Sequence, residues 1–292
     1  MIFDDYIALL KSAAEPTRLR LLQLCARGEL SVSDLVSVLG QSQPRVSRHL
    51  KLLCDAGLLE RYRDGHWMYF RVPLLGPGAD LAHRLLEPLD LNAAPFNKDR
   101  QRLDEMLGSQ QDHTADPLLR RFNRLLLSYF LTHSVGDLLD VGVGSGAVLK
   151  LLAQRSTQAV GIDLDPESRR TARREMIRSG SQQSTIRPGD MHDLDFDDNV
   201  FDTVILDEVL LDAKSPQRVL SEALRVVRPT GRMLIVEHQT RDRIGESTDL
   251  IRELAQHSQL RIGSFRRSAD NIGEYLVAEA IPDQEHVVRR PA

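Results

Sequence analysis

A glycine-rich turn follows a short apolar run in the sequence LLDVGVGSGAVLKLLA, residues 138–153. Glycine has no Cβ, so Gly142, Gly144 and Gly146 can adopt positive φ and let a ligand approach the backbone closely. If a helix begins at about Ala147, its N-terminus points toward this turn and favours an anionic or hydrogen-bond-accepting ligand. The turn therefore predicts a site for a nucleotide-like small molecule.

Three carboxylates narrow the choice of ligand. The glycines satisfy the G-x-G-x-x-A pattern of dinucleotide sites, and Asp163 lies where that fold places its ribose carboxylate. Asp140, two residues before the first glycine, could accept a hydrogen bond from a ligand ammonium group, whereas it would repel a pyrophosphate. Asp190 follows another short apolar run, where a carboxylate could meet an adenine amino group. Together they favour an adenosyl ligand that carries an amine.

Residues 116–281 resemble the class I S-adenosylmethionine-dependent methyltransferases. The resemblance rests on four motifs in order: DVGVGSG, VGIDLDP, PGDMHDLDFDDNVFDTVI and LRVVRPTGRMLIVE. It implies S-adenosylmethionine or S-adenosylhomocysteine as ligand, with Asp140 near the methionine amino group, Asp163 at the ribose hydroxyls and Asp190 by the adenine. The expected ligand-binding residues are Asp140, Gly142, Gly144, Gly146, Asp163, Leu164, Asp190, Met191 and Asp207.

Alternating strands and helices must position these residues. We expect strands over 138–141, 159–163, 185–187, 200–206 and 232–237, and two closing strands over 261–267 and 274–280. Helices are expected over 147–154, 166–179, 215–227 and 246–257, after an amphipathic helix from 116 to about 133. This alternation predicts an α/β, Rossmann-like domain with a seven-stranded mixed sheet and the ligand at the carboxyl ends of the strands.

Catalytic residues stay unassigned. Methyl transfer needs a positioned acceptor and, for some acceptors, a base. Asp207 and Glu208 follow the fourth strand, and Glu237 and His238 follow the fifth, but such residues equally cap helices or face solvent. Arsenite methylation is not expected, because no cysteine occurs from Gly108 onward.

The N-terminal region predicts a helix-turn-helix. Residues 31–40 indicate a short helix closed by Gly40, and residues 41–57 a longer one that begins near Ser42. Two strands, 58–63 and 66–72, follow, linked by Asp64-Gly65 as a hairpin. One face of the second helix and the hairpin tip could contact a DNA major groove and phosphates, through Gln43, Arg45, Ser47, Arg48, Lys51, Arg63 and His66. Trp67 is expected to pack the hairpin onto the helices.

Residues 1–75 resemble the ArsR family of winged helix-turn-helix repressors, through EPTRLRLLQLC, SQPRVSRHLKLLCDAGLLE and RDGHWMYFRV. The resemblance implies binding to double-stranded operator DNA. Where metal-sensing members carry Cys-x-Cys, this chain has Ser31-Val32-Ser33, and a hydroxyl does not replace a thiolate for a soft metal. Asp80 and His83, at i,i+3 spacing, could belong to the other metal site of the family, but two lone ligands more often form part of a solvated face, so no metal site is expected.

Four parts are expected along the chain. They are a DNA-binding domain (1–75), a helical dimerisation segment with a linker (76–115), an S-adenosylmethionine-binding domain (116–281) and a flexible tail (282–292). In ArsR relatives the second part is a dimerisation helix that pairs with the first helix of the chain, so the resemblance implies a homodimer, as a palindromic operator requires.

Composition fits a cytoplasmic protein with two domains. The chain has 292 residues, 41% of them hydrophobic and 27% charged, and its N-terminus is acidic where a signal peptide would be basic. No apolar run is long enough to span a membrane. Residues 1–75 carry 10 basic against 8 acidic residues, whereas 76–292 carry 28 against 34. With only Cys25 and Cys54, a disulfide framework is not expected.

Two functions fit these features. In the first, a dimeric repressor uses its methyltransferase-like domain as a sensor of S-adenosylmethionine or S-adenosylhomocysteine, and the resemblance points to genes of the methionine cycle as its targets. In the second, the chain is an active methyltransferase for an unknown small molecule and regulates its own operon. The fusion favours the sensor, because an enzyme does not need a DNA-binding domain.

Overall fold

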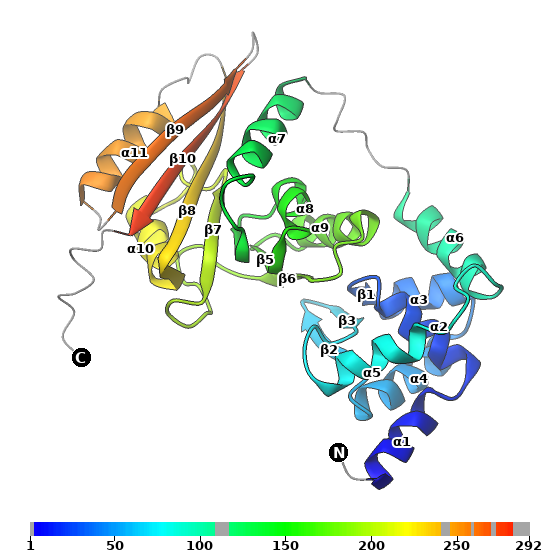
Figure 1. Ribbon diagram of the computed structural model, residues 1–292. Coiled ribbons are helices and arrows are strands. Elements are labelled where there is room, and N and C mark those ends of the chain that lie inside the picture. The colour runs from blue at the N-terminus through cyan, green and yellow to red at the C-terminus, as the bar shows by residue number, and fades with distance from the viewer. Residues whose placement is uncertain (1–2, 109–116, 241–245, 258–259, 270–272, 283–292) are drawn as a thin grey trace. The chain divides into compact units, whose positions relative to one another are not determined.

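The computed structural model describes residues 3–108, 117–240, 246–257, 260–269 and 273–282. The chain divides into two compact units, with the main boundary between Gln110 and Gln111. Unit 1 is mostly helical, and unit 2 is built on a large sheet (Figure 1). Within the described residues, no helix is both long and apolar enough to cross a membrane.

Unit 1 has six helices among the described residues. They are α1 (Phe3–Ala13), α2 (Pro16–Cys25), α3 (Val32–Leu39), α4 (Gln43–Asp55), α5 (Pro77–Leu86) and α6 (Phe96–Leu107). Helix α3 begins with a capping box, in which the Ser31 hydroxyl accepts from the Asp34 N–H while the Asp34 carboxylate accepts from the Ser31 N–H. It ends at Gly40, whose φ of +64° is left-handed, as expected from the sequence.

A small antiparallel sheet completes the winged helix. Its strand order is β1 (Leu30–Ser31), β3 (Trp67–Arg71), β2 (Glu60–Asp64). The hairpin turn lies one residue later than expected. Asp64 pairs with Trp67, so the two turn residues are Gly65 and His66 rather than Asp64 and Gly65. Gly65 has a φ of +57°, which explains why glycine suits the first turn position.

Helices α5 and α6 share the core of unit 1. Leu81, Leu86, Leu103 and Leu107 pack with the leucines of α2, α3 and α4. A bidentate ion pair joins α2 to α6, because Arg20 donates to both carboxylate oxygens of Asp99 at 2.6 and 2.5 Å. The segment expected to serve dimerisation is thus, in large part, also structural support for the helix-turn-helix.

Unit 2 contains the seven-stranded mixed sheet that the sequence predicts. Its strand order is β6-β5-β4-β7-β8-β10-β9. Strands β4 to β8 are parallel, and β10 is antiparallel to both β8 and β9. The strands are β4 (Gly136–Val141), β5 (Ser156–Asp163), β6 (Ser184–Pro188), β7 (Phe201–Asp207), β8 (Val227–Thr240), β9 (Leu260–Ala269) and β10 (Gly273–Pro282).

Helices cover both faces of this sheet. They are α7 (Pro117–Tyr129), α8 (Ala147–Ala153), α9 (Pro166–Ser179), α10 (Pro216–Val226) and α11 (Glu246–His257). Figure 1 shows α7 and α8 on one side of the sheet and α10 and α11 on the other. The buried strand residues between them, such as Leu139, Val204 and Met233, form the core. The carboxyl ends of the parallel strands therefore meet along one edge, where a ligand would bind.

Candidate functional sites

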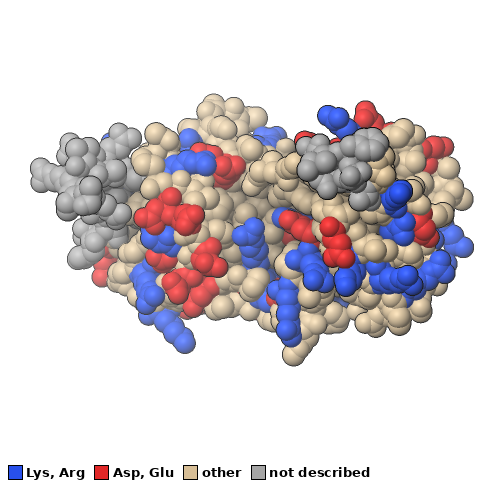
Figure 2. All heavy atoms as spheres, turned by 90° about the horizontal axis from the view of Figure 1, so that it is seen from below, with Lys and Arg blue, Asp and Glu red and all other residues tan. Residues whose placement is uncertain are grey.

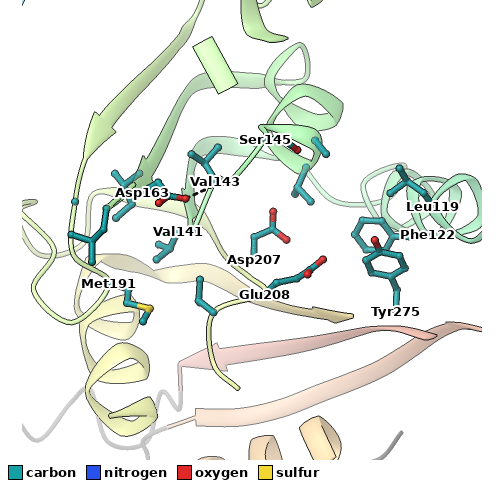
Figure 3. Close-up of a pocket in the computed structure, with 18 residues that line it drawn as sticks. Leu119, Phe122, Val141, Val143, Ser145, Asp163, Met191, Asp207, Glu208 and Tyr275 are labelled. Atoms are coloured by element: carbon teal, nitrogen blue, oxygen red, sulfur yellow. Dashed lines mark hydrogen bonds between the residues drawn. The ribbon is translucent and has the colours of Figure 1, made fainter. Parts of the chain in front are cut away.

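A cavity of about 520 Å³ lies at the carboxyl ends of β4, β5 and β7 (Figure 3). Its walls come from the glycine turn, the loops after β5, β6 and β7, helix α7 and strand β10. The lining residues are Leu119, Phe122, Val141, Gly142, Val143, Gly144, Ser145, Ala147, Val148, Ile162, Asp163, Leu164, Gly189, Met191, Asp207, Glu208, Val209 and Tyr275. Six of the nine expected ligand-binding residues line it. Asp140, Gly146 and Asp190 do not.

The turn after β4 requires glycine at position 142. Gly142 has a φ of +81°, and a Cβ there would lie 2.2 Å from Val209 Cγ1 and 2.9 Å from the Asp207 carbonyl oxygen. The N–H groups of Gly142 and Val143 both donate to the Ile162 carbonyl at 2.9 Å, which fixes the turn against β5. Gly146, with a φ of +83°, is the N-cap residue immediately before α8. The turn thus brings bare backbone to the cavity wall.

Asp163 lines the cavity with its carboxylate already oriented. One oxygen accepts from the Gly144 N–H at 3.0 Å, and the other from the Asp165 N–H at 2.8 Å. Buried Arg169 donates to the carbonyl oxygens of Asp163 and Leu164 at 2.9 and 2.8 Å, which holds the backbone of this loop. The side chain of Leu164, 64% exposed, lies at the cavity rim.

Asp140 is fully buried on β4 and does not line the cavity. Among the described residues, neither of its carboxylate oxygens has a hydrogen-bond partner. Burial raises the pKa of Asp140 to about 7, the nearby backbone N–H of Leu149 opposes this shift, and the carboxylate of Asp163 adds to it. An unpaired buried carboxylate is costly unless a cation or a donor compensates it. Asp140 therefore favours a cationic ligand near the turn.

Asp190 is occupied by its own loop. Its carboxylate accepts from the backbone N–H of His192 at 2.8 Å and contacts His192 Nδ1 at 2.9 Å. The hydrogen bond from the His192 backbone, together with the His192 ring, lowers the pKa of Asp190. Its neighbours Gly189 and Met191 line the cavity instead. In this structure, then, the wall at this loop is formed by the residues on either side of Asp190.

Further carboxylates gather at the ends of β7 and β8. Burial, followed by the charge of Asp140, raises the pKa of Asp207 well above its ordinary value. Desolvation raises the pKa of Glu208, and nearby His238 opposes this shift. Glu237 is buried, accepts from the Leu210 N–H at 2.9 Å, and has its pKa raised by burial to about 7. Of these carboxylates, Asp207 and Glu208 line the cavity, and Glu237 does not.

Two aromatic residues at the cavity were not expected from the sequence. Phe122 of α7 and Tyr275 of β10 stack with ring centroids 4.3 Å apart. The ring centroids of Tyr275 and His238 are 4.6 Å apart. Phe122 lies on the apolar stripe of the amphipathic helix expected from residue 116 to about 133, so the helix pattern could have indicated it. No local pattern marks Tyr275, because its place depends on the pairing of β10 with β8.

The expected DNA-binding residues lie at the surface of unit 1. On α4, the side chains of Gln43, Arg45, Ser47, Arg48 and Lys51 are all exposed. The opposite stripe of α4 is fully buried, through Val46, Leu50 and Leu53. Figure 2 shows a face of the molecule on which Lys and Arg side chains gather, with Asp and Glu side chains among them. The second helix of the motif thus presents a polar, cationic face suited to a DNA groove.

The hairpin adds exposed residues next to its turn. Arg63 and His66 are both exposed, and Arg63 Nε donates to the Gly65 carbonyl at 2.9 Å. Trp67 keeps 40% of its surface exposed, so it packs against the protein only in part. The tip of the hairpin therefore offers donors for phosphate and one exposed aromatic ring.

Of the two serines at the position of the metal-binding cysteines, Ser31 has a structural role. Ser31 is buried and caps α3, whereas Ser33 is exposed. Asp80 and His83 are both exposed on α5. Across the described part of the chain, no three His, Cys, Asp or Glu side chains are placed together to hold a metal ion.

Family models match both units. The model described as "Bacterial regulatory protein, arsR family" matches residues 15–61, and the model described as "Methyltransferase domain" matches residues 139–235. An arsenic resistance transcriptional regulator of Pseudomonas putida is 41% identical over 98 residues, which cover 33% of this chain and 75% of that regulator. The arsenical resistance operon repressor of Escherichia coli is 46% identical over 67 residues, which cover 23% of this chain and 57% of the repressor.

Unit 2 also has relatives. A phosphatidylethanolamine N-methyltransferase of Cereibacter sphaeroides is 38% identical over 109 residues, which cover 37% of this chain and 53% of that enzyme. This chain therefore spans little more than half of that enzyme and of the E. coli repressor. The crystal structure of an S-adenosylmethionine-dependent methyltransferase from Aquifex aeolicus aligns with 18% identity and a TM-score of 0.49, over 57% of this chain and 94% of that one.

Two observations identify the family of unit 1. One is the winged helix with the exposed polar face of α4, and the other is the match over 75% of the P. putida regulator. The strand order and the match to the methyltransferase model establish the fold of unit 2. The chain therefore belongs to the ArsR family of bacterial regulators, and it carries a class I methyltransferase domain C-terminal to its DNA-binding winged helix-turn-helix.

Proposed function

We propose that this protein is a transcriptional repressor whose methyltransferase domain binds S-adenosylmethionine or S-adenosylhomocysteine as an effector. The observation that carries the proposal is the cavity at the glycine turn, which is lined by oriented Asp163 and by the two acids at the end of β7, Asp207 and Glu208. Asp140 supports a ligand with an ammonium group, because that charge would compensate a buried carboxylate. Genes of the methionine and S-adenosylmethionine cycle are the natural targets of such a sensor.

The expected ligand contacts follow from the cavity. Asp163 would accept hydrogen bonds from the ribose hydroxyls, and Gly142 and Gly144 would allow the ligand to approach the backbone. Leu164 and Met191 would flank the adenine, with Asp190 behind Met191, while Asp207 and Asp140 would face the methionine part of the ligand. Gly146 would act by setting the start of α8.

The effector must act through DNA binding. A ligand shifts this equilibrium only if its affinity differs between the DNA-competent and the incompetent form of the protein. We expect the protein to bind as a homodimer, because a two-fold operator needs two recognition helices. Arg45, Arg48 and Lys51, with Gln43 and Ser47, would contact the major groove, and Arg63 and His66 the adjacent phosphates.

An operator titration tests the proposal. Duplex DNA selected from a random-sequence pool by the full-length protein is titrated in a mobility-shift assay with no ligand, with S-adenosylmethionine and with S-adenosylhomocysteine. At least one ligand should change the operator affinity fivefold or more. If both ligands bind in calorimetry but neither changes the DNA affinity, the sensor function is wrong.

Two variants test ligand binding by unit 2 and DNA binding by unit 1 independently. Asp163→Ala should lose a charge-assisted interaction of about 1.5–3 kcal/mol, a roughly 10- to 150-fold weaker ligand affinity, and keep its DNA affinity in the absence of ligand. Arg48→Ala should show the opposite pattern, with weakened operator binding and unchanged ligand affinity. If Asp163→Ala binds the ligand like wild type, the ribose assignment fails, and if Arg48→Ala binds the operator like wild type, the reading-helix assignment fails.

Active methyl transfer is the second candidate. The observation that favours it is Glu208, a carboxylate with a raised pKa in the cavity wall beside Asp207. The similarity to the relative named as a phosphatidylethanolamine N-methyltransferase also supports active methyl transfer. Incubation of the protein with methyl-labelled S-adenosylmethionine and a cell extract tests it, with Asp163→Ala as the control. A labelled product that depends on the protein and on Asp163 would support an enzyme, and its absence would leave the sensor as the sole function.

A further inference from the structure

The cavity has two ends. In Figure 3, Asp163, Val143 and Met191 lie toward one end, and Leu119, Phe122 and Tyr275 toward the other. If an adenosyl ligand occupies the end at the glycine turn, as proposed above, the aromatic end remains for a second molecule. Glu208 lies between the two, and its carboxylate points toward Phe122 and Tyr275.

Glu208 is held in an unusual backbone conformation. Its φ of +54° is left-handed, which non-glycine residues adopt at a cost and keep only where their surroundings enforce it. The Glu208 N–H donates to the Val236 carbonyl at 2.8 Å, which anchors this backbone to β8. Within the described residues, no hydrogen bond or ion pair engages the Glu208 carboxylate. The chain therefore presents an uncommitted carboxylate to the cavity.

The side chains that line the cavity limit the charge of the second molecule that could bind there. Among the described residues that line the cavity, none is Lys, Arg or His, whereas Asp163, Asp207 and Glu208 are acidic. An anion would find no cationic side chain among these lining residues, and His238, which packs against Tyr275, is not one of them. A cation would find the Glu208 carboxylate and the ring faces of Phe122 and Tyr275, to which organic cations are attracted. Leu119 adds apolar surface next to them.

We propose that the aromatic end of the cavity binds an organic ammonium ion, with its nitrogen at Glu208 and its apolar part against Phe122 and Tyr275, as a methyl acceptor. This inference rests on the proposed adenosyl site at the other end. It names a class of acceptor, a primary amine with an apolar substituent, for the methyltransferase domain.

In the methyl-transfer step, every proton and electron pair is accounted for by Glu208, the amine and the sulfonium. The Glu208 carboxylate takes one proton from the ammonium ion, which frees the nitrogen lone pair. That lone pair forms a bond to the sulfonium methyl carbon, while the carbon–sulfur bond breaks and its electron pair returns to sulfur as a thioether. The products are the N-methylammonium ion and S-adenosylhomocysteine, and Glu208 later releases its proton to water. Desolvation of Glu208 raises its pKa, which suits this uptake of a proton.

Three probes of similar shape and different charge test the proposal. The full-length protein is titrated by calorimetry with 2-phenylethylamine, 2-phenylethanol and 3-phenylpropanoate, each with and without saturating S-adenosylhomocysteine. The amine should bind at least tenfold more tightly than the alcohol or the carboxylate. Glu208→Gln should lose at least tenfold in amine affinity, and Glu208→Lys should lose amine binding and gain affinity for the carboxylate. Exposed Glu167 on α9 provides the matched control, and Glu167→Gln should bind the amine like wild type.

The outcomes separate this inference from the proposed function. Equal affinities for the amine and the alcohol, or an unchanged amine affinity in Glu208→Gln, would overturn the ammonium site. Loss of S-adenosylhomocysteine binding together with amine binding in Glu208→Gln would also overturn it, because Glu208 would then belong to the adenosyl site. Amine binding that depends on Glu208 in a protein that binds no adenosyl ligand would refute the proposed function alone. Failure of labelled S-adenosylmethionine to methylate the bound amine would overturn the transfer step.

Discussion

Replacing Asp140 by asparagine should stabilise unit 2 and weaken its ligand site. In the free protein, burial raises the pKa of Asp140 from its ordinary 3.8 to about 7. Between these two values the native state holds a proton that the unfolded chain has lost, so stability falls as the pH rises from about 4 to 7. A shift of about three units corresponds to about 4 kcal/mol as an upper limit. The asparagine side chain would avoid this cost because it does not ionise.

The net gain should be about 2 kcal/mol at pH 8. The asparagine amide keeps a buried donor without a partner, which offsets part of the gain by about 1–3 kcal/mol. The variant should be about 2 kcal/mol less stable than the wild type at pH 4, where Asp140 is protonated, and the difference should rise by about 4 kcal/mol to favour the variant above pH 7. Glu237, whose pKa is also raised to about 7, titrates in the same window in both proteins, whereas Asp207, whose pKa is raised in part by the Asp140 charge, contributes to the difference.

Urea unfolding at pH 5 and pH 8 measures this effect. Far-UV circular dichroism follows both units, whereas the fluorescence of Trp67, the single tryptophan, follows unit 1. The variant should shift the transition seen by dichroism alone, and its affinity for S-adenosylmethionine should fall at least tenfold. An advantage of equal size at pH 5 and pH 8 would refute the titration of Asp140. A less stable variant at pH 8 would refute the idea that its charge is unpaired.

Three further substitutions test other parts of the structure. Gly142→Ala should weaken binding of S-adenosylhomocysteine at least tenfold in calorimetry, because the new methyl group would lie 2.2 Å from a valine methyl at a φ of +81°, and an unchanged affinity would contradict this turn geometry. Asp99→Ala should lower the free energy of unfolding of unit 1, followed by tryptophan fluorescence, by about 3 kcal/mol, because Asp99 is fully buried in its ion pair. Asp104→Ala, which removes an exposed ion pair, should cost less than about 1 kcal/mol, and equal losses in the two variants would refute the importance of burial. Ser31→Ala should cost about 1 kcal/mol as a lost helix cap, while exposed Ser33→Ala should cost less than about 0.5 kcal/mol; the reverse order would refute the cap.

Features that depend on neighbouring residues in the chain were well predicted from the sequence. All seven strands of unit 2 occur where the apolar runs indicate, and α9 matches its expected bounds, because glycines and prolines mark the ends of these elements. The glycine turn and the exposure of the α4 face follow in the same way from local pattern. Strand β8 is longer than expected, since it continues to Thr240 in its pairing with β10.

Features that depend on distant contacts were not predicted. Tyr275 reaches the cavity because β10 inserts between β8 and β9, which no local pattern reveals. The chemistry of Glu208 was weighed only as a strand-end acid, and its left-handed backbone, anchored to Val236, could not be read from the sequence. Asp190 fits the expected motif, but its carboxylate is engaged by His192, two residues away.

The cap at Ser31 affects how easily this protein could acquire a response to metals. A pair of thiolates at positions 31 and 33 is the smallest change that would imitate its metal-sensing relatives. The same change would remove the hydroxyl that holds the first turn of α3, the helix that precedes the reading helix. A variant on that route would lose stability before it gained a useful binding site, so an accessible evolutionary path would first need a stabilising substitution elsewhere in the winged helix.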